Sequence, residues 1–219
     1  MTLAAVVFDL DETLAVTTRD RQRLLADTAT AAGLEPIEYG TYERAHRESV
    51  TGDTRARIFE TLIDDESIDP HAVAETYRGV VNEHLEPIEG AEALLTQLTT
   101  GAGYRVGVLT DGPERAQCSK IEKLGWGDLL DATVVTGRME TRKPDPVAFE
   151  AVLGALSVDA DQAVYVGDKP EADVEGALDA GMRAIQVLYQ GGPDPHPRAD
   201  AHIERENLGT ELPAVVESL

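Results

Sequence analysis

The sequence predicts an α/β fold, in which a doubly wound parallel sheet carries a smaller helical unit inserted after the first strand. Three patterns indicate this fold. Short valine-rich apolar runs alternate with helical segments, the runs end in polar residues, and a long stretch with only helical patterns follows the first run. Strands that alternate with helices form parallel sheets through right-handed crossovers, so the polar residues after the strands gather at one edge.

The sheet is expected to begin in the apolar run 3–8, which has the composition of a strand buried on both faces. Further strands are predicted at 104–109, 131–135, 162–166, 184–188 and 201–203, and helices at 91–98, 114–124, 146–156, 173–180 and 206–219, the last interrupted by Pro213. Residues 1–15 and 87–219 therefore form one Rossmann-like α/β core.

Residues 16–86 predict a helical insertion without a convincing strand. Its helices are expected at 23–32, 39–50, 54–63 and 70–85. Thr17 or Thr18 is expected to cap the first helix and Gly33 to end it, and Asp69-Pro70 begins the last, because Asp caps helices and Pro suits the first helical position. An insertion at this point lies over the carboxyl ends of the strands, where it can act as a lid.

The charge balance excludes several classes of partner. The 219 residues include 41 acidic and 19 basic side chains, for a net charge of -22, and such a surface repels nucleic acid and anionic membranes. No apolar run approaches the roughly 20 residues of a membrane span. A lone Cys118 and the lack of a signal-peptide pattern predict a cytoplasmic protein. The acidic surface is typical of halophilic proteins, with an ordinary acidic protein as the alternative.

Two carboxylates, Asp9 and Asp11, directly follow the first predicted strand. Side chains two apart in an extended segment point the same way, and two such charges repel unless a cation lies between them. This pair therefore indicates a metal-assisted site. The alternative interpretation is that Asp9 caps the next helix and Asp11 is solvated.

Other predicted strands also end in polar residues, which belong to the same edge of the sheet. Singly, they are compatible with a turn or a surface lysine, but together they indicate one site. They are Thr110-Asp111-Gly112, Lys143 in the loop that follows the next strand, and Asp168 and Asp173. Lys120 and Lys123, on the predicted helix 114–124, are interpreted as solvated surface residues.

In this order, the motifs resemble those of the haloacid dehalogenase superfamily of phosphohydrolases, and the similarity spans the whole chain. Its most specific elements are the Asp-Leu-Asp-Glu-Thr that starts at Asp9 and the Gly-Asp-x-x-x-x-Asp of residues 167–173. The insertion resembles the helical cap of that family. The resemblance implies a Mg²⁺-dependent phosphatase of a small phosphorylated metabolite, similar to phosphoglycolate phosphatases, that works through an aspartyl phosphate.

The resemblance also implies the role of each residue. Asp9 matches the nucleophile and Asp11 the general acid and base, while Lys143 would neutralise charge on the phosphoryl oxygens. Thr110 would bind phosphate together with the backbone N–H groups of Asp111 and Gly112. Asp168 would bind the metal with the Asp9 carboxylate and the Asp11 carbonyl. Asp173 would orient Lys143 or a metal-bound water. Lys169, where a small polar residue is usual, either points to solvent or reaches over the site.

Two other functions remain open at this stage: a 2-haloacid dehalogenase on the same fold, and a non-catalytic phosphate-binding domain. Asp11 favours the phosphatase, because a halide leaving group needs no proton. Within 44–57, Arg47, Arg55 and Arg57 are candidates to meet a substrate carboxylate or second phosphate, although surface charge is the commoner role of an arginine. The identity of the ester and the oligomeric state are not predicted.

Overall fold

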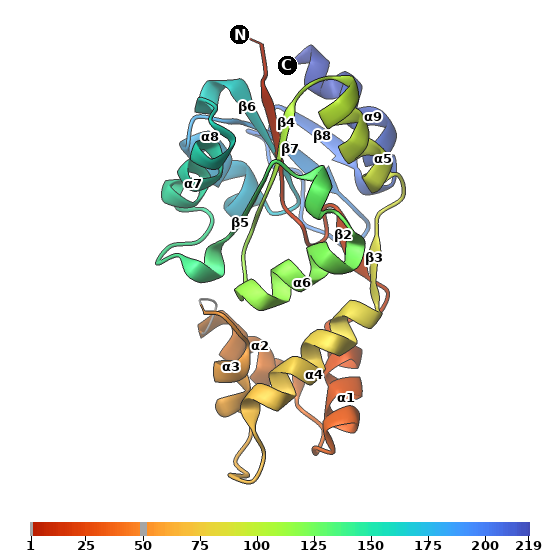
Figure 1. Ribbon diagram of the computed structural model, residues 1–219, viewed down its shortest axis with the longest axis vertical. Helices are drawn as coiled ribbons and strands as arrows, with labels where there is room; N and C mark the ends of the chain where they lie inside the picture. Colours follow the sequence, from red (N-terminus) through yellow and green to blue (C-terminus); the bar gives the residue numbers. More distant parts are fainter. Residues whose placement is uncertain (1, 49–51) are drawn as a thin grey trace.

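A six-stranded parallel sheet forms the centre of the molecule (Figure 1). The computed structural model describes residues 2–48 and 52–219. The strand order is β5-β4-β1-β6-β7-β8. The strands are β1 (Ala5–Phe8), β4 (Arg105–Thr110), β5 (Ala132–Val135), β6 (Ala163–Gly167), β7 (Arg183–Leu188) and β8 (Ala201–Glu204). The predicted α/β class and parallel sheet are confirmed.

Helices cover both faces of this sheet because side chains alternate along each strand. Val6 and Phe8 belong to one apolar cluster, which also holds residues of α5 (Ala91–Thr96), α6 (Glu114–Leu124) and α9 (Leu208–Ser218). Ala5 and Val7 belong to the other cluster, with α7 (Pro146–Leu156) and α8 (Gly176–Asp179). Contrary to the prediction, Pro213 lies inside α9 without interrupting it. π-Helical turns, Gln97–Gly101 and Pro170–Glu175, adjoin α5 and α8, where longer α-helices were predicted.

The first four helices after β1 form a unit with its own apolar core, which we call the helical insertion. They are α1 (Arg21–Ala32), α2 (Tyr39–Glu48), α3 (Ala56–Glu60) and α4 (Pro70–Glu83). The rings of Tyr42, Phe59 and Tyr77 pack together at centroid distances of 5.6–6.1 Å. The predicted caps at Gly33 and Asp69 are confirmed, but Asp20, rather than Thr17 or Thr18, caps α1. Residues 49–50 of the predicted second helix lie outside the described residues.

A short antiparallel ribbon joins the insertion to the core. Its strands β2 (Ala15–Thr17) and β3 (Leu85–Pro87) pair with Thr17 opposite Leu85. The prediction that residues 16–86 contain no strand is therefore wrong. Three-residue strands show no alternation of their own, and their partners are far apart in the sequence.

The insertion also contacts the core at the carboxyl edge of the sheet, beneath α6 in Figure 1. The Gly52 N–H donates to the Gly137 carbonyl at 3.1 Å, and the Glu114 N–H donates to the Gly52 carbonyl at 3.3 Å. Asn82 Nδ2 on α4 donates to Ser119 Oγ on α6 at 3.2 Å. The insertion therefore lies against the core at the edge where the strands end. Among the described helices, none has the length and apolar character of a membrane span.

Candidate active site

Asp9 emerges from the central strand β1 into a buried position at the carboxyl edge of the sheet. Its carboxylate lies 3.1 Å from Lys143 Nζ and 3.5 Å from Lys169 Nζ. Burial alone would raise the pKa of this carboxyl, but the two ammonium groups outweigh it and hold the pKa below its usual range. Asp9 is therefore a buried carboxylate whose ionised form is favoured. The alternative that Asp9 caps a helix is wrong, because no helix starts here.

Lys143 is the fully buried cation of the site. Its Nζ donates to Asp173 Oδ1 at 2.7 Å and to the Tyr165 hydroxyl at 2.8 Å, and that hydroxyl donates to the Leu109 carbonyl at 2.8 Å. Burial opposes its charge, but Asp173 and Asp9 raise the pKa of Lys143 well above its usual range. The surface-lysine interpretation is therefore excluded, and the ammonium is fixed beside Asp9.

Asp173 anchors the loop that carries Asp168. Its Oδ1 accepts from Lys143 Nζ, and its Oδ2 accepts from the Lys169 backbone N–H at 2.8 Å. Gly167, at the end of β6, permits this approach, because a Cβ there would lie 2.5 Å from Asp173 Oδ2. With both oxygens engaged, Asp173 is suited to orient Lys143.

Asp168 offers an oxygen that receives no hydrogen bond from the described residues. Its Oδ2 accepts from the Tyr189 hydroxyl at 3.3 Å, whereas its Oδ1 is buried and accepts no hydrogen bond within residues 2–48 and 52–219. Burial, reinforced by Asp173 and Asp9, raises the pKa of Asp168 to about 7. A cation at this position would hold the group ionised.

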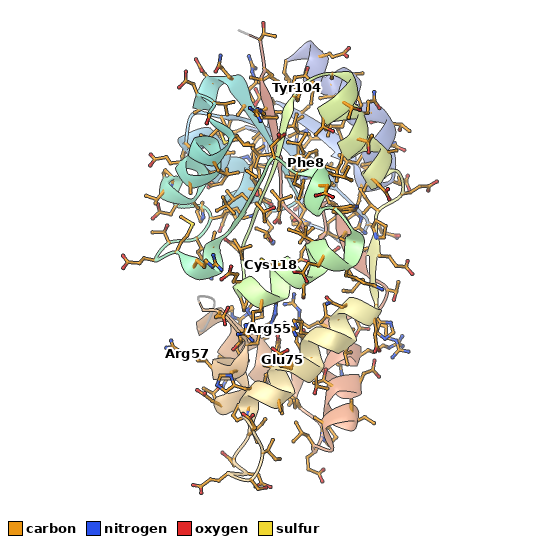
Figure 2. All side chains as sticks on the ribbon, viewed as in Figure 1. Phe8, Arg55, Arg57, Glu75, Tyr104 and Cys118 are labelled. Atoms are coloured by element: carbon orange, nitrogen blue, oxygen red, sulfur yellow. The ribbon has the colours of Figure 1, made fainter. Side chains whose placement is uncertain are left out.

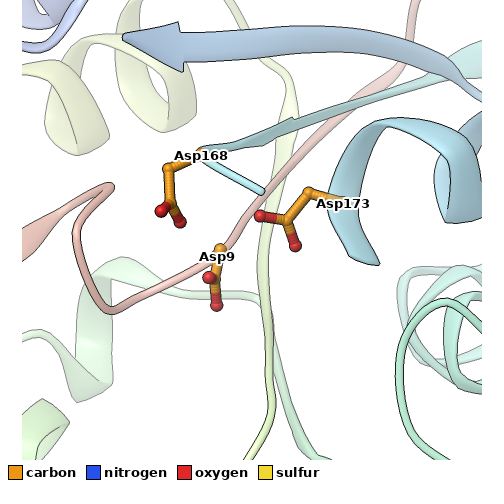
Figure 3. Close-up of side chains that lie close together, drawn as sticks. All are labelled: Asp9, Asp168 and Asp173. Atoms are coloured by element: carbon orange, nitrogen blue, oxygen red, sulfur yellow. The ribbon is translucent and has the colours of Figure 1, made fainter. Parts of the chain in front are cut away.

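Carboxylate oxygens of Asp9, Asp168 and Asp173 lie within 4.8 Å of one another, and the three side chains converge in Figure 3. A buried cluster of hard oxygen donors, one of them unpaired, fits Mg²⁺. Lys169 is half exposed, and its Nζ reaches Asp9 and, at 4.0 Å, Asp168 Oδ1. Of the two positions left open for Lys169, the structure shows the one over the site.

Thr110 is the last residue of β4, which pairs with β1, and Asp111 and Gly112 follow it. Thr110 is buried, and its hydroxyl accepts from Gln117 Nε2 at 2.8 Å. Asp111 Oδ1 accepts from Thr136 Oγ1 at 2.8 Å and from the Lys143 backbone N–H at 3.2 Å. The Asp111 side chain therefore joins two loops of the site, which a simple turn would not require.

Asp11 faces α6, where its side chain is 38% exposed. Both carboxylate oxygens lie 2.6 Å from Lys120 Nζ, and Oδ2 also accepts from Gln117 Nε2 at 3.0 Å. Although burial opposes ionisation, these contacts hold the pKa of Asp11 well below its usual range. The interpretation of Lys120 as a solvated surface residue is therefore wrong, since it is 5% exposed, whereas Lys123 is exposed as expected.

Four site residues were missed in the sequence. Gln117 and Lys120 share one face of α6, and their three-residue spacing, with few lysines in the chain, was the available signal. The sequence contains no signal of a site role for Tyr165 and Tyr189, since aromatic residues in or after a buried strand usually pack in the core. Their hydroxyls instead support Lys143 and Asp168.

Sequence comparison decides the family. A model of the haloacid dehalogenase-like hydrolases matches residues 6–187, most of the chain. This protein belongs to that family. The resemblance inferred from the motifs is confirmed, and the chain is a hydrolase of the haloacid dehalogenase-like family.

Within this family, the chain is 33% identical to a phosphoglycolate phosphatase of Rhodospirillum rubrum over 194 residues, which cover 84% of this chain and 79% of the relative. It is 29% identical to a glyceraldehyde 3-phosphate phosphatase of Pyrococcus abyssi over 201 residues, which cover 85% and 82%. A crystal structure of a 2-haloacid dehalogenase from Pseudomonas syringae pv. Tomato DC3000 superposes with a TM-score of 0.70 at 26% identity, covering 98% of both chains.

Proposed function

We propose that the protein is a Mg²⁺-dependent phosphatase that hydrolyses a small phosphorylated metabolite through an aspartyl phosphate on Asp9. One observation carries the proposal: the Asp9 carboxylate is buried and ionised between Lys143 and Lys169, at the sheet edge that faces the helical insertion. A buried carboxylate flanked by cations is a nucleophile beside the charges that a phosphate ester requires.

In the first step, an Asp9 oxygen attacks phosphorus, and the bond between phosphorus and the ester oxygen breaks. Asp11, two residues on, donates a proton to the departing alkoxide. Asp11 is ionised while it contacts Lys120, so this role requires that substrate binding exchange that contact and protonate the carboxyl. General acid help of this kind is typically worth roughly 10²–10⁴-fold in rate.

In the second step, Asp11 takes a proton from the water that attacks the aspartyl phosphate, so that inorganic phosphate leaves and the Asp9 carboxylate is restored. Lys143 and the Thr110 hydroxyl hold the phosphoryl oxygens in both steps. Asp9, Asp168 and the Asp11 carbonyl would hold Mg²⁺, which supplies charge neutralisation for the phosphoryl group. Asp173 keeps Lys143 in place.

The size class of the substrate follows from the position of the insertion. Its contacts with α6 and with Gly137 support a role as a cap over the strand ends. A site enclosed in this way favours small esters over phosphorylated macromolecules. The relatives named for phosphoglycolate and glyceraldehyde 3-phosphate hydrolysis support the same class.

The test is release of inorganic phosphate from a panel of metabolite phosphates by the purified chain. We expect activity with Mg²⁺, its loss with EDTA and its return when Mg²⁺ is restored. Asp9→Asn should abolish turnover and leave the fold intact by circular dichroism, because an amide is a poor nucleophile. No phosphate release from any ester would refute the proposal, and halide release from 2-chloropropionate would establish the dehalogenase alternative.

A further inference from the structure

The face of the insertion that meets α6 carries an arginine, Arg55, whose Nε has no hydrogen-bonding partner in the part of the chain that the structure describes. Arg55 immediately precedes α3, and its buried Nε donates to no acceptor within the described ranges 2–48 and 52–219. The guanidinium carbon lies 5.3 Å from the centroid of the Tyr77 ring. A buried N–H group without an acceptor is costly, so Arg55 has the character of a group that pairs with a ligand.

Three other cations at the same boundary have a carboxylate of the chain as a partner, whereas no ion pair of Arg55 occurs among the described residues. The paired cations are Arg115 with Asp53 at 3.0 Å, Arg78 with Glu75, and Lys120 with Asp11 at 2.6 Å. The positive charge of Arg55 is therefore free to meet an anion that enters with the substrate.

Arg55 also borders α6, the helix whose Gln117 and Lys120 hold the Asp11 carboxylate. A cavity between the insertion and α6 is lined by Arg55, Thr54 and Tyr77 on one side and by Arg115 and Ala116 on the other. Figure 2 shows Arg55 at this boundary, whereas Arg57 lies on the outer side of the insertion. Burial opposes the charge of Arg55, yet Tyr42, Tyr77 and the Asp11 carboxylate together raise its pKa, which places Asp11 within electrostatic reach.

We propose that Arg55 determines the substrate class by binding a carboxylate on the organic part of the phosphate ester. This inference rests on the proposed phosphatase function. A planar guanidinium matches a carboxylate with two parallel hydrogen bonds, which an aldehyde or hydroxyl cannot provide. The two relatives are named for substrates that differ in this group, because phosphoglycolate carries a carboxylate and glyceraldehyde 3-phosphate an aldehyde.

The test compares two esters of equal length: phosphoglycolate, and 2-hydroxyethyl phosphate, in which a hydroxymethyl group replaces the carboxylate. We expect the wild type to favour phosphoglycolate in kcat/KM by about 10- to 100-fold, the usual value of a charge-assisted contact. Arg55→Met, which keeps an apolar stem over Tyr77, should remove most of this preference. Arg55→Lys, which keeps the charge but loses the planar fork, should retain part of it.

Arg57→Met is the matched control. It removes the same charge from an exposed side chain that lies two residues after Arg55 in the sequence. It should leave the preference at its wild-type value. A purely structural Arg55 would lower kcat/KM for both esters equally and keep their ratio. Equal losses on both esters, or no preference in the wild type, would overturn the inference. If Arg55→Met does not fold, the ratio of kcat/KM for the two esters is measured on Arg55→Lys.

Binding separates this inference from the phosphatase proposal. Calorimetry on the Asp9→Asn variant, with and without Arg55→Met, measures the affinity for both esters without turnover. Tighter binding of phosphoglycolate that depends on Arg55 supports the inference. If the wild type nevertheless releases no phosphate, only the phosphatase proposal is refuted. Phosphate release without such a difference in affinity would refute only the role of Arg55.

Discussion

The core and the insertion each hold a cation near the site, and the two cations differ in how their N–H groups are satisfied. In the core, Lys143 is enclosed by Asp9, Asp173 and Tyr165, all within 3.1 Å. In the insertion, Arg55 stacks on Tyr77 and makes no hydrogen bond through its buried Nε within the described residues. A cation whose N–H groups all have acceptors fixes the positions of its neighbours, whereas one with an unpaired N–H group can bind a ligand. The difference agrees with the proposed function, in which the core carries out the reaction and the insertion selects the substrate.

Removal of Lys143 is expected to cause the largest losses of stability and activity. Lys143→Met leaves Asp9 and Asp173 buried without their shared cation, and loss of one partner of a buried pair costs about 3–5 kcal/mol of stability. Phosphate release should also fall by roughly 10²–10³-fold, the usual cost of one charge-stabilising donor. Urea unfolding and kcat/KM are the measurements.

Lys123→Met provides the control for this change, since Lys123 is exposed on α6. It should alter neither the unfolding midpoint nor the rate. A Lys143→Met protein as stable as the Lys123→Met protein would show that the buried network contributes little to stability, and the contrast between the two regions would then be lost.

Replacement of Asp11 tests the side of the core that faces the insertion. Asp11→Asn should slow phosphorylation by alkyl phosphates roughly 10²–10⁴-fold, because an alkoxide needs a proton to leave. The loss should be smaller with p-nitrophenyl phosphate, whose leaving group is stable without one. Single-turnover kinetics measure this step alone, and equal losses on both esters would contradict the acid role.

A smaller effect is expected at Lys120. Its partner Asp11 is 38% exposed, so water can replace the ammonium in Lys120→Met, unlike at Asp9. The loss of stability should therefore be about 1 kcal/mol, the typical cost of a substitution, and well below that of Lys143→Met. Paired urea titrations of the two variants check the order, which would be wrong if Lys120→Met were the less stable.

Salt is expected to act on the surface and leave the buried network unaffected. With a net charge of -22, screening of self-repulsion should raise the thermal midpoint by a few degrees between about 0.1 M and about 2 M KCl. The stability lost in Lys143→Met should be the same at both concentrations. A flat or falling midpoint would count against the halophilic character that we propose for this chain.

The core could be predicted from the sequence further than the insertion could. Buried parallel strands leave continuous apolar runs, and Asp9, Thr110 and Asp168 follow such runs directly, so local pattern and chain order were enough to bring them together. Lys120 was missed because its burial depends on the carboxylate of Asp11, more than a hundred positions away. Arg55 looked like its neighbours until the packing of α3 against α4 separated it from Arg57.

The ribbon of β2 and β3 has a consequence for modularity. Since Thr17 lies directly opposite Leu85, the chain leaves and re-enters the core at adjacent points, and a two-residue hairpin turn can close the gap if everything between them is removed. Shortened in this way, the chain would retain the residues of its six-stranded sheet together with Asp9, Lys143 and Asp168, and under the proposed function it would open them to bulky phosphorylated partners. A different helical unit joined at the same two points would then change the choice of substrate without replacing these residues.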